Sequence, residues 1–118
     1  MNYGGKINAD AQKSIDACIE AYSCCEQTIA HCLQQGKQHV DMTMMGPLMD
    51  CVDVARACAD MMMRQSPHAV EMSATCARVA DMCAEACMTM NSDPVMKRCA
   101  GICRTCAEAC RSLAGVRA

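Results

Sequence analysis

Apolar side chains recur along the chain at alternating steps of three and four residues, in four segments separated by loops that contain Gly or Pro. This spacing places the apolar positions on one face of an α-helix and the charged positions on the opposite face. We expect helices at about residues 8–35, 47–64, 67–90 and 94–114. No segment sustains an alternation of apolar and polar residues with a period of two, so no β-sheet is expected.

The ends of these helices are expected at residues that favour helix termini. Asn8 is a candidate N-cap of the first helix and Gly36 a candidate stop, while Pro47 suits the first position of the second helix. Ser66 and Pro67 suit the N-cap and the first position of the third helix. Because most of the loops are short, we predict an all-α, up-down-up-down four-helix bundle that forms a single domain over all 118 residues.

The predicted inward faces carry Cys where a bundle ordinarily carries Leu or Ile. The chain has 13 Cys and 13 Met but no Phe or Trp, so sulfur supplies much of the expected core, which is cysteine-lined. Of the 13 cysteines, all but Cys24, which stands beside Cys25, fall on the inward stripes. The full set is Cys18, Cys24, Cys25, Cys32, Cys51, Cys58, Cys76, Cys83, Cys87, Cys99, Cys103, Cys106 and Cys110.

Composition disfavours several classes of function. The formal net charge is −2 and aromatic residues make up 2% of the chain, with no basic run, which argues against nucleic-acid binding. No apolar run approaches the roughly 20 residues of a membrane-spanning helix. The first residues lack the apolar segment of a signal peptide, so the chain as written is expected in the cytoplasm. No catalytic Ser/His/Asp set, phosphate loop or carboxylate pair is evident, and we expect no enzymatic activity.

The inward thiols have two interpretations that involve no metal. Packing explains a single buried Cys but explains twelve poorly, because Ala, Val or Leu would fill the core without risk of oxidation. A disulfide scaffold or redox relay is opposed by the odd number of cysteines and by helix geometry. Residues i and i+4 have Cβ atoms about 5–6 Å apart, whereas a disulfide needs about 3.5–4.5 Å. The CxxC pair Cys103 and Cys106 lies mid-helix, not at the helix start that is typical of redox motifs.

Binding of a soft metal explains the thiol stripes best. Structural zinc usually takes CxxC pairs on turns, and iron–sulfur clusters take compact Cys runs in loops. Cu(I) prefers thiolate and thioether ligands and accepts low coordination numbers. If each copper takes two thiolates and each thiolate bridges two coppers, the capacity is about one Cu(I) per Cys, or ~13 per chain. A zinc or cadmium buffer and a disulfide or redox relay are the alternatives.

The methionines favour copper as the metal. Residues 36–46 are expected to form the longest loop, and up-down threading places them beside residues 91–93 at one end of the bundle. Thioethers are neutral and bind Cu(I) more weakly than thiolates, so this end suits a mouth that passes copper inward. The expected mouth ligands are His39, Met42, Met44, Met45 and Met49. His31 lies off the inward stripe and is expected to be a surface residue.

Together these features resemble the bacterial copper storage proteins, which are Cys-rich four-helix bundles that hold many Cu(I) ions. The resemblance rests on the inward Cys stripes, the four cysteines within residues 99–110, the pair Cys83 and Cys87, and the Met-rich segment after the first helix. It implies Cu(I) storage by thiolates, a mouth lined by Met and His, and assembly into homotetramers. It leaves two locations open, because exported members of the family carry a twin-arginine presequence and cytosolic members do not. The expected partners are copper ions and a copper chaperone or copper-requiring client protein.

Overall fold

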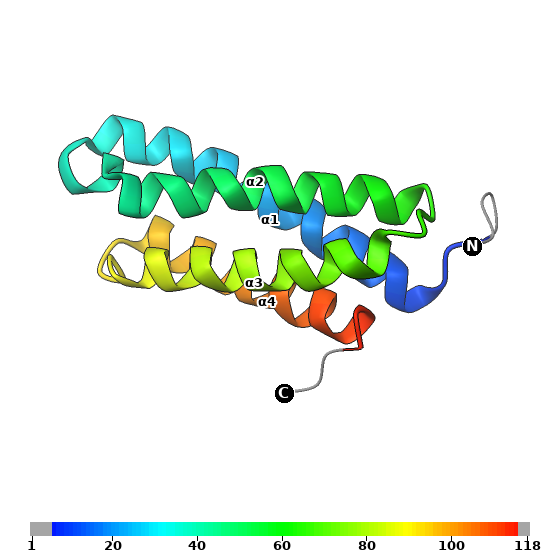
Figure 1. The fold of residues 1–118 in the computed structure, drawn as a ribbon. Coiled ribbons are helices and arrows are strands. Elements are labelled where there is room, and N and C mark those ends of the chain that lie inside the picture. The colour runs from blue at the N-terminus through cyan, green and yellow to red at the C-terminus, as the bar shows by residue number, and fades with distance from the viewer. Residues whose placement is uncertain (1–5, 116–118) are drawn as a thin grey trace.

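The computed structural model describes residues 6–115 (Figure 1). Residues 1–5 and 116–118 of the predicted domain lie outside the described residues. Within the described part, the chain forms α-helices and one short 3₁₀ helix, and no strand. The elements are α1 (Ala9–Gln35), η1 (Lys37–Val40), α2 (Met42–Met63), α3 (Ala69–Met88) and α4 (Pro94–Leu113).

Successive helices run in opposite directions, which confirms the predicted up-down-up-down bundle (Figure 1). Each helix packs against two neighbours, in the order α1, α2, α3, α4 and back to α1. The α1–α2 and α3–α4 connections meet at one end, which we call the loop end, and the α2–α3 connection lies at the other end with the start of α1. The bundle measures 48 × 26 × 19 Å. None of the helices in residues 6–115 combines the length and the apolar character that crossing a membrane requires.

The first helix is bounded by the two residues that the sequence indicated. The Asn8 side chain accepts a hydrogen bond from the backbone N–H of Ala11 at 2.8 Å, as an N-cap does. At the other end, the N–H of Gly36 donates to the carbonyl oxygen of Cys32 at 2.9 Å. Gly36 has a φ of +70° and Lys37 a φ of +53°, so the chain leaves α1 through two consecutive left-handed positions.

The second helix begins at Met42, whereas the sequence had predicted a start at Pro47. The carbonyl oxygen of Asp41 accepts the N–H groups of the residues three and four positions later, at 2.9 and 2.8 Å, so the helix is established before Pro47. Pro47 therefore lies inside α2, where it supplies no N–H to the carbonyl four residues back. The expected loop over residues 36–46 is replaced by η1 and the first turn of α2, which place its methionines on a helix.

The third helix also differs at both ends from the prediction. It begins at Ala69, with His68 as its N-cap residue, not with Ser66 and Pro67 as N-cap and first position. The Ser66 hydroxyl instead accepts the N–H of His68 at 3.1 Å, a local turn that occupies the side chain before the helix starts. At its C-terminal end α3 stops at Met88.

The core of the bundle is a column of sulfur atoms separated by small side chains. All 13 cysteines are buried, including Cys24, which is 3% exposed. Cys24, which the sequence placed off the inward stripe, is buried as well, because α1 packs against both α2 and α4 and so buries more than one stripe. The fully buried alanines between the thiols let the helices approach closely; they include Ala21, Ala55, Ala80 and Ala107.

Candidate metal centre

One group of thiols takes a single cysteine from each of the four helices. The Sγ atoms of Cys25 on α1, Cys51 on α2, Cys83 on α3 and Cys103 on α4 all lie within 4.8 Å of one another. The Sγ of Cys25 is 3.8 Å from that of Cys83 and 3.6 Å from that of Cys103. We call this group the central thiol set. It forms because the inward stripes of all four helices meet at one level of the bundle.

A second group lies farther from the loop end and comprises Cys18, Cys76, Cys106 and Cys110. The Sγ of Cys18 lies 3.4 Å from that of Cys110, 3.8 Å from that of Cys106 and 3.9 Å from that of Cys76. We call this group the distal thiol set. The side chain of Cys58 also interacts with Cys18 and Cys110, and its Sγ is 3.6 Å from the hydroxyl oxygen of Ser73.

The thiol column continues from the central set toward the loop end. Cys83 of the central set also groups with Cys87 and Cys99, whose Sγ atoms lie within 4.8 Å of its own and of each other. Beyond them, the thiol of Cys32 donates to the Sδ of Met96 at 3.8 Å. Twelve of the cysteines thus follow the axis of the bundle, from the distal set to Met96.

Cys24 lies beside this column and has polar neighbours of its own. Its Sγ is 4.0 Å from Oγ1 of Thr28, and the guanidinium of Arg98 donates to it at 3.5 Å. Cys24 also interacts with Cys99, which connects it to the column. All 13 predicted thiol ligands are therefore brought into one interior region.

The spacing of the sulfurs suits metal coordination. The separations of 3.4–4.0 Å are far longer than the roughly 2.03–2.05 Å of a disulfide bond, and all 13 cysteines are free thiols. A metal held about 2.3 Å from four sulfurs at the corners of a tetrahedron separates those sulfurs by about 3.8 Å. The closest sulfur contacts join different helices, so the within-helix spacing considered from the sequence is only part of the ligand arrangement.

The thiols affect one another's ionisation. Burial raises the pKa of Cys32 above its ordinary value, and the charge of Asp93 adds to the effect. In the distal set, hydrogen bonds with Cys106 and Cys110, together with burial, raise the pKa of Cys76. The pKa of Cys110 is lowered, because neighbours such as Cys106 donate hydrogen bonds to its thiolate. The set therefore releases a first proton more easily than the remaining ones, which an incoming metal must displace.

The four predicted mouth methionines lie in two different environments. Met44 and Met45 are buried, at 4% and 8% exposed, near the loop end. Met42 and Met49 are 73% and 49% exposed, so the structure does not bring them to the thiol column. The period of α2 turns these two side chains outward. Met96, which is not among the predicted mouth ligands, is fully buried, and its Sδ lies 3.8 Å from the Sγ of Cys32.

The predicted ligand His39 lies at the loop end, where it meets a carboxylate and a second histidine. The Nε2 atoms of His39 and His31 lie 2.9 and 2.7 Å from the same Oδ2 atom of Asp93. His31, expected at the surface, is only partly exposed, at 21%, because its ring packs beside Asp93 and its Nε2 is held by that carboxylate. The sequence carried a signal for the pairing of His39 with Asp93, because up-down threading brings residues 36–46 and 91–93 to one end of the bundle, but it carried none for His31.

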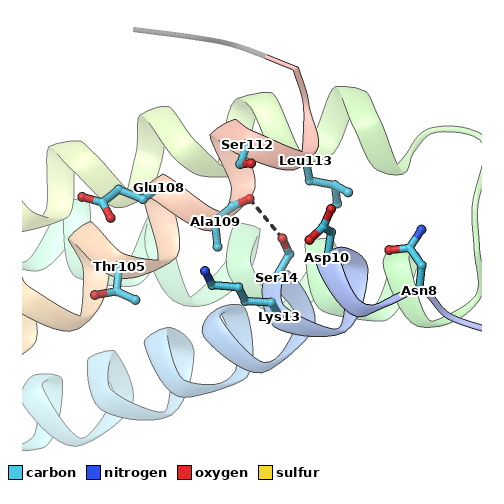
Figure 2. Close-up of a pocket in the computed structure, with 9 residues that line it drawn as sticks. All are labelled: Asn8, Asp10, Lys13, Ser14, Thr105, Glu108, Ala109, Ser112 and Leu113. Carbon is cyan, nitrogen blue, oxygen red and sulfur yellow. Dashed lines mark hydrogen bonds between the residues drawn. The ribbon is translucent and has the colours of Figure 1, made fainter.

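The thiol column does not open into the surface pocket beside Ser14. That pocket, of about 330 Å³, lies between the start of α1 and the end of α4 (Figure 2). Its lining includes Lys13, Glu108 and Ser14, whose hydroxyl donates to the carbonyl oxygen of Ala109 at 3.0 Å. No cysteine lines it. The candidate metal centre is therefore the enclosed interior and not a surface cleft.

Comparison with known proteins identifies the family. The family described as "Copper storage protein" matches residues 7–115 of the chain. The chain belongs to the copper storage protein family. Among solved structures, a protein of Nitrosospira multiformis, Nmul_A1745, is 30% identical, with a TM-score of 0.85 over 92% of this chain and 97% of that one. No match was found among curated proteins.

Two further structures similar to this copper storage protein come from the same family. The Cu(I)-bound copper storage protein BsCsp3 is 30% identical, with a TM-score of 0.83 over 89% of this chain and 98% of that one. The apo form of copper storage protein 3 from Bacillus subtilis is 29% identical, with a TM-score of 0.78 over 88% of this chain and 98% of that one. The family resemblance inferred from the Cys stripes and the Met-rich segment is thus confirmed.

Proposed function

We propose that this copper storage protein binds multiple Cu(I) ions through the thiolates of its core. The observation that carries the proposal is the continuous column of free, buried thiols, whose central set takes one cysteine from each helix. Thiolates are the ligands that Cu(I) prefers, and thiolates that bridge two ions allow many ions to share one column. With about one Cu(I) per thiol, the capacity is ~13 ions per chain. Storage of this kind requires no catalytic step.

The proposed route for copper begins at the loop end. Met44, Met45 and Met96 are buried there, and thioethers hold Cu(I) without having to lose a proton. From Met96 the ion passes to Cys32, whose sulfur lies 3.8 Å away, and then to Cys87 and Cys99. The central thiol set fills next and the distal set last. Binding becomes tighter along this route, because thioethers give way to thiolates.

A titration under anaerobic conditions tests the proposal. Reduced apoprotein is titrated with Cu(I) in the presence of a competing Cu(I) chelator, and the number of ions withheld from the chelator is counted. We expect saturation near 13 equivalents per chain. Saturation at one or two equivalents would contradict storage, since it would indicate a single defined copper site.

Zinc buffering is the second candidate, because each four-thiol set has the ligand number of a structural zinc site. The two candidates differ in the metal that the core retains. We expect Cu(I) to displace Zn(II) from loaded protein and Zn(II) not to displace Cu(I), since soft thiolates favour Cu(I). Displacement in the opposite direction would favour the zinc buffer.

We also propose that the chain assembles into a homotetramer and exchanges copper with a chaperone or a copper-requiring client. The family resemblance implies this assembly, and large apolar side chains lie exposed on the helices, among them Leu33 at 63%, Val70 at 52% and Met82 at 62% exposed. Light scattering on purified protein tests the assembly and expects four times the mass of the 12.7 kDa chain. We propose a cytoplasmic location; the alternative is an exported, periplasmic location, reached through a twin-arginine presequence that has since been removed. Fractionation of the source cells distinguishes the two.

A further inference from the structure

A group of nitrogen and oxygen ligands stands at the loop end, apart from the thiol sets. It consists of His31 near the end of α1, His39 in η1 and Asp93 at the N-cap of α4. Their ligand atoms all lie within 4.8 Å of one another, and both imidazole Nε2 atoms point at one carboxylate oxygen. The two rings meet edge to face, with centroids 5.6 Å apart.

The geometry of the group is close to that of three ligands on one face of a metal ion. Ligand atoms about 2.0–2.1 Å from a shared metal, as in zinc sites with His, lie about 3 Å from one another. The His31–Asp93 and His39–Asp93 separations are already 2.7 and 2.9 Å. Small shifts of the three side chains would therefore admit an ion between them.

The carboxylate of Asp93 is oriented by the backbone, as a metal ligand usually is. Its Oδ1 accepts the N–H of Val95 at 3.0 Å, which leaves Oδ2 directed at the two rings. The three side chains are each 16–21% exposed, so an ion can reach them from solvent. An exposed face also leaves coordination positions for water.

The chemistry of these ligands differs from that of the thiol column. Two imidazoles and one carboxylate suit borderline divalent ions such as Zn(II), Ni(II), Co(II) or Cu(II), whereas Cu(I) prefers sulfur. The carboxylate supplies one negative charge, which offsets part of the charge of a divalent ion. We propose that His31, His39 and Asp93 bind one divalent transition-metal ion, separately from the Cu(I) held by the thiols.

The proposed ion would lie where several elements of the bundle meet, next to the thiol column. At the loop end it would link three elements, namely the end of α1, η1 and the start of α4. His31 is the neighbour of Cys32, the thiol that contacts Met96. The proposal depends on the proposed function in one point only: the divalent ion would lie beside the route by which Cu(I) is proposed to enter.

Co(II) is the probe that separates the two kinds of ligand. Protein saturated with Cu(I), so that its thiolates are occupied, is titrated with Co(II) without oxygen, and bound metal is counted after dialysis. We expect one Co(II) per chain, with weak visible ligand-field bands and no thiolate-to-cobalt charge-transfer band. Excess Zn(II) is expected to remove these bands.

One double variant and one control variant decide the assignment. The double variant His39→Gln and Asp93→Asn removes two ligands but keeps an N-cap residue at position 93. It should weaken Co(II) binding by more than about 100-fold, because even the loss of a partner that only orients a ligand costs 10- to 100-fold. His68→Gln is the matched control, since His68 is 70% exposed and lies near Glu71, away from the site. Circular dichroism verifies that each variant is folded.

Three results would overturn the proposal. They are the absence of bound Co(II) at a Co(II) concentration of about 1 mM, Co(II) binding that the double variant leaves unchanged, and a spectrum of bound Co(II) that contains only a thiolate-to-cobalt charge-transfer band. Failure of the proposed function is recognised separately, because the chelator titration would then show little Cu(I) bound. In that case the Co(II) titration is run on reduced apoprotein. Co(II) bound to thiolates is then identified by its charge-transfer band. Co(II) bound at the proposed site is identified by the ligand-field bands that the double variant lacks.

Discussion

The Sγ atoms of Cys18 and Cys110 lie 3.4 Å apart, the shortest separation resolved between two thiols, although 92 residues separate them in the chain. Cys18 belongs to α1 and Cys110 to α4, so the contact joins the first and last helices of the bundle. Both residues are fully buried, and both belong to the distal thiol set. Two sulfurs at this distance, with two more thiols beside them, can share one metal ion or a small group of ions.

Loss of this pair is predicted to lower the copper capacity. Replacement of both Cys18 and Cys110 by Ala should reduce the number of Cu(I) ions by at least about two, because each thiol accounts for about one ion. The chelator titration measures the change. Ser14→Ala is the matched control, since Ser14 is buried on the same helix and contacts α4 without offering sulfur. A double variant that kept full capacity would show that the distal set holds no copper.

Uptake is predicted to depend on the buried methionines of the loop end. Replacement of Met44 and Met45 by Leu keeps side-chain volume but removes two thioethers, so loading should become slower while the final capacity stays unchanged. Stopped-flow mixing with a Cu(I) complex measures the rate. The control is the same change at Met63 and Met72, which lie toward the opposite end of the bundle. If the control variant were the slower one, copper would enter at the end where α2 and α3 connect.

The stability of the apoprotein is predicted to fall at alkaline pH. Burial raises the pKa of Cys32 in the folded state above 9.0, its ordinary value. Above that pH the unfolded thiol ionises while the folded one keeps its proton, so the folded state binds more protons and the free energy of unfolding decreases as pH rises. Each thiol that stays protonated contributes a loss of up to about 1.4 kcal/mol per pH unit.

Urea denaturation of reduced apoprotein at pH 8 and pH 10 measures this effect. The Cys32→Ala variant should show a smaller decrease between the two conditions than the parent protein, because one buried thiol no longer titrates. Equal decreases in the two proteins would indicate that Cys32 ionises as readily in the folded state as in the unfolded state.

The close approach of the helices is predicted to depend on the buried alanines. Ala80 is fully buried on α3, between Cys76 and Cys83 in the sequence. Ala80→Leu adds volume to a packed core and should destabilise the apoprotein by about 1–3 kcal/mol. It should also reduce copper capacity, because the thiols of α3 are moved from their partners. Ala30→Leu, on an exposed position of α1, is the control and should change neither quantity appreciably.

The fold was accessible from the sequence because its apolar pattern is regular. The stripe of the second helix, which runs from Leu48 through Cys51 and Cys58 to Met62, is buried at every one of these positions. On the third helix the sequence left Val79 and Ala80 as alternatives for one inward position. The structure buries Ala80 completely and Val79 only in part, since the smaller side chain suits the narrow core.

The parts that the sequence did not predict depend on interactions between segments. The early start of α2 depends on the Asp41 carbonyl, and a pattern of side chains does not report backbone hydrogen bonds. The outward position of Met49 follows from the period of α2, which turns Leu48 and Cys51 inward. The partners of His31 are His39 in η1 and Asp93 at the start of α4. Because His31 lies off the inward stripe of its own helix, the helical pattern did not indicate these partners.

The central thiol set has a consequence for biosynthesis. Because Cys25, Cys51, Cys83 and Cys103 come one from each helix, the set exists only after the entire bundle has closed. A nascent chain from which only α1 to α3 have emerged from the ribosome offers three of the four sulfurs. A polypeptide truncated before α4 offers the same three. Tight retention of metal at this level thus reports a completely synthesised, correctly threaded polypeptide, and unfinished chains should surrender their copper to competing thiols such as glutathione.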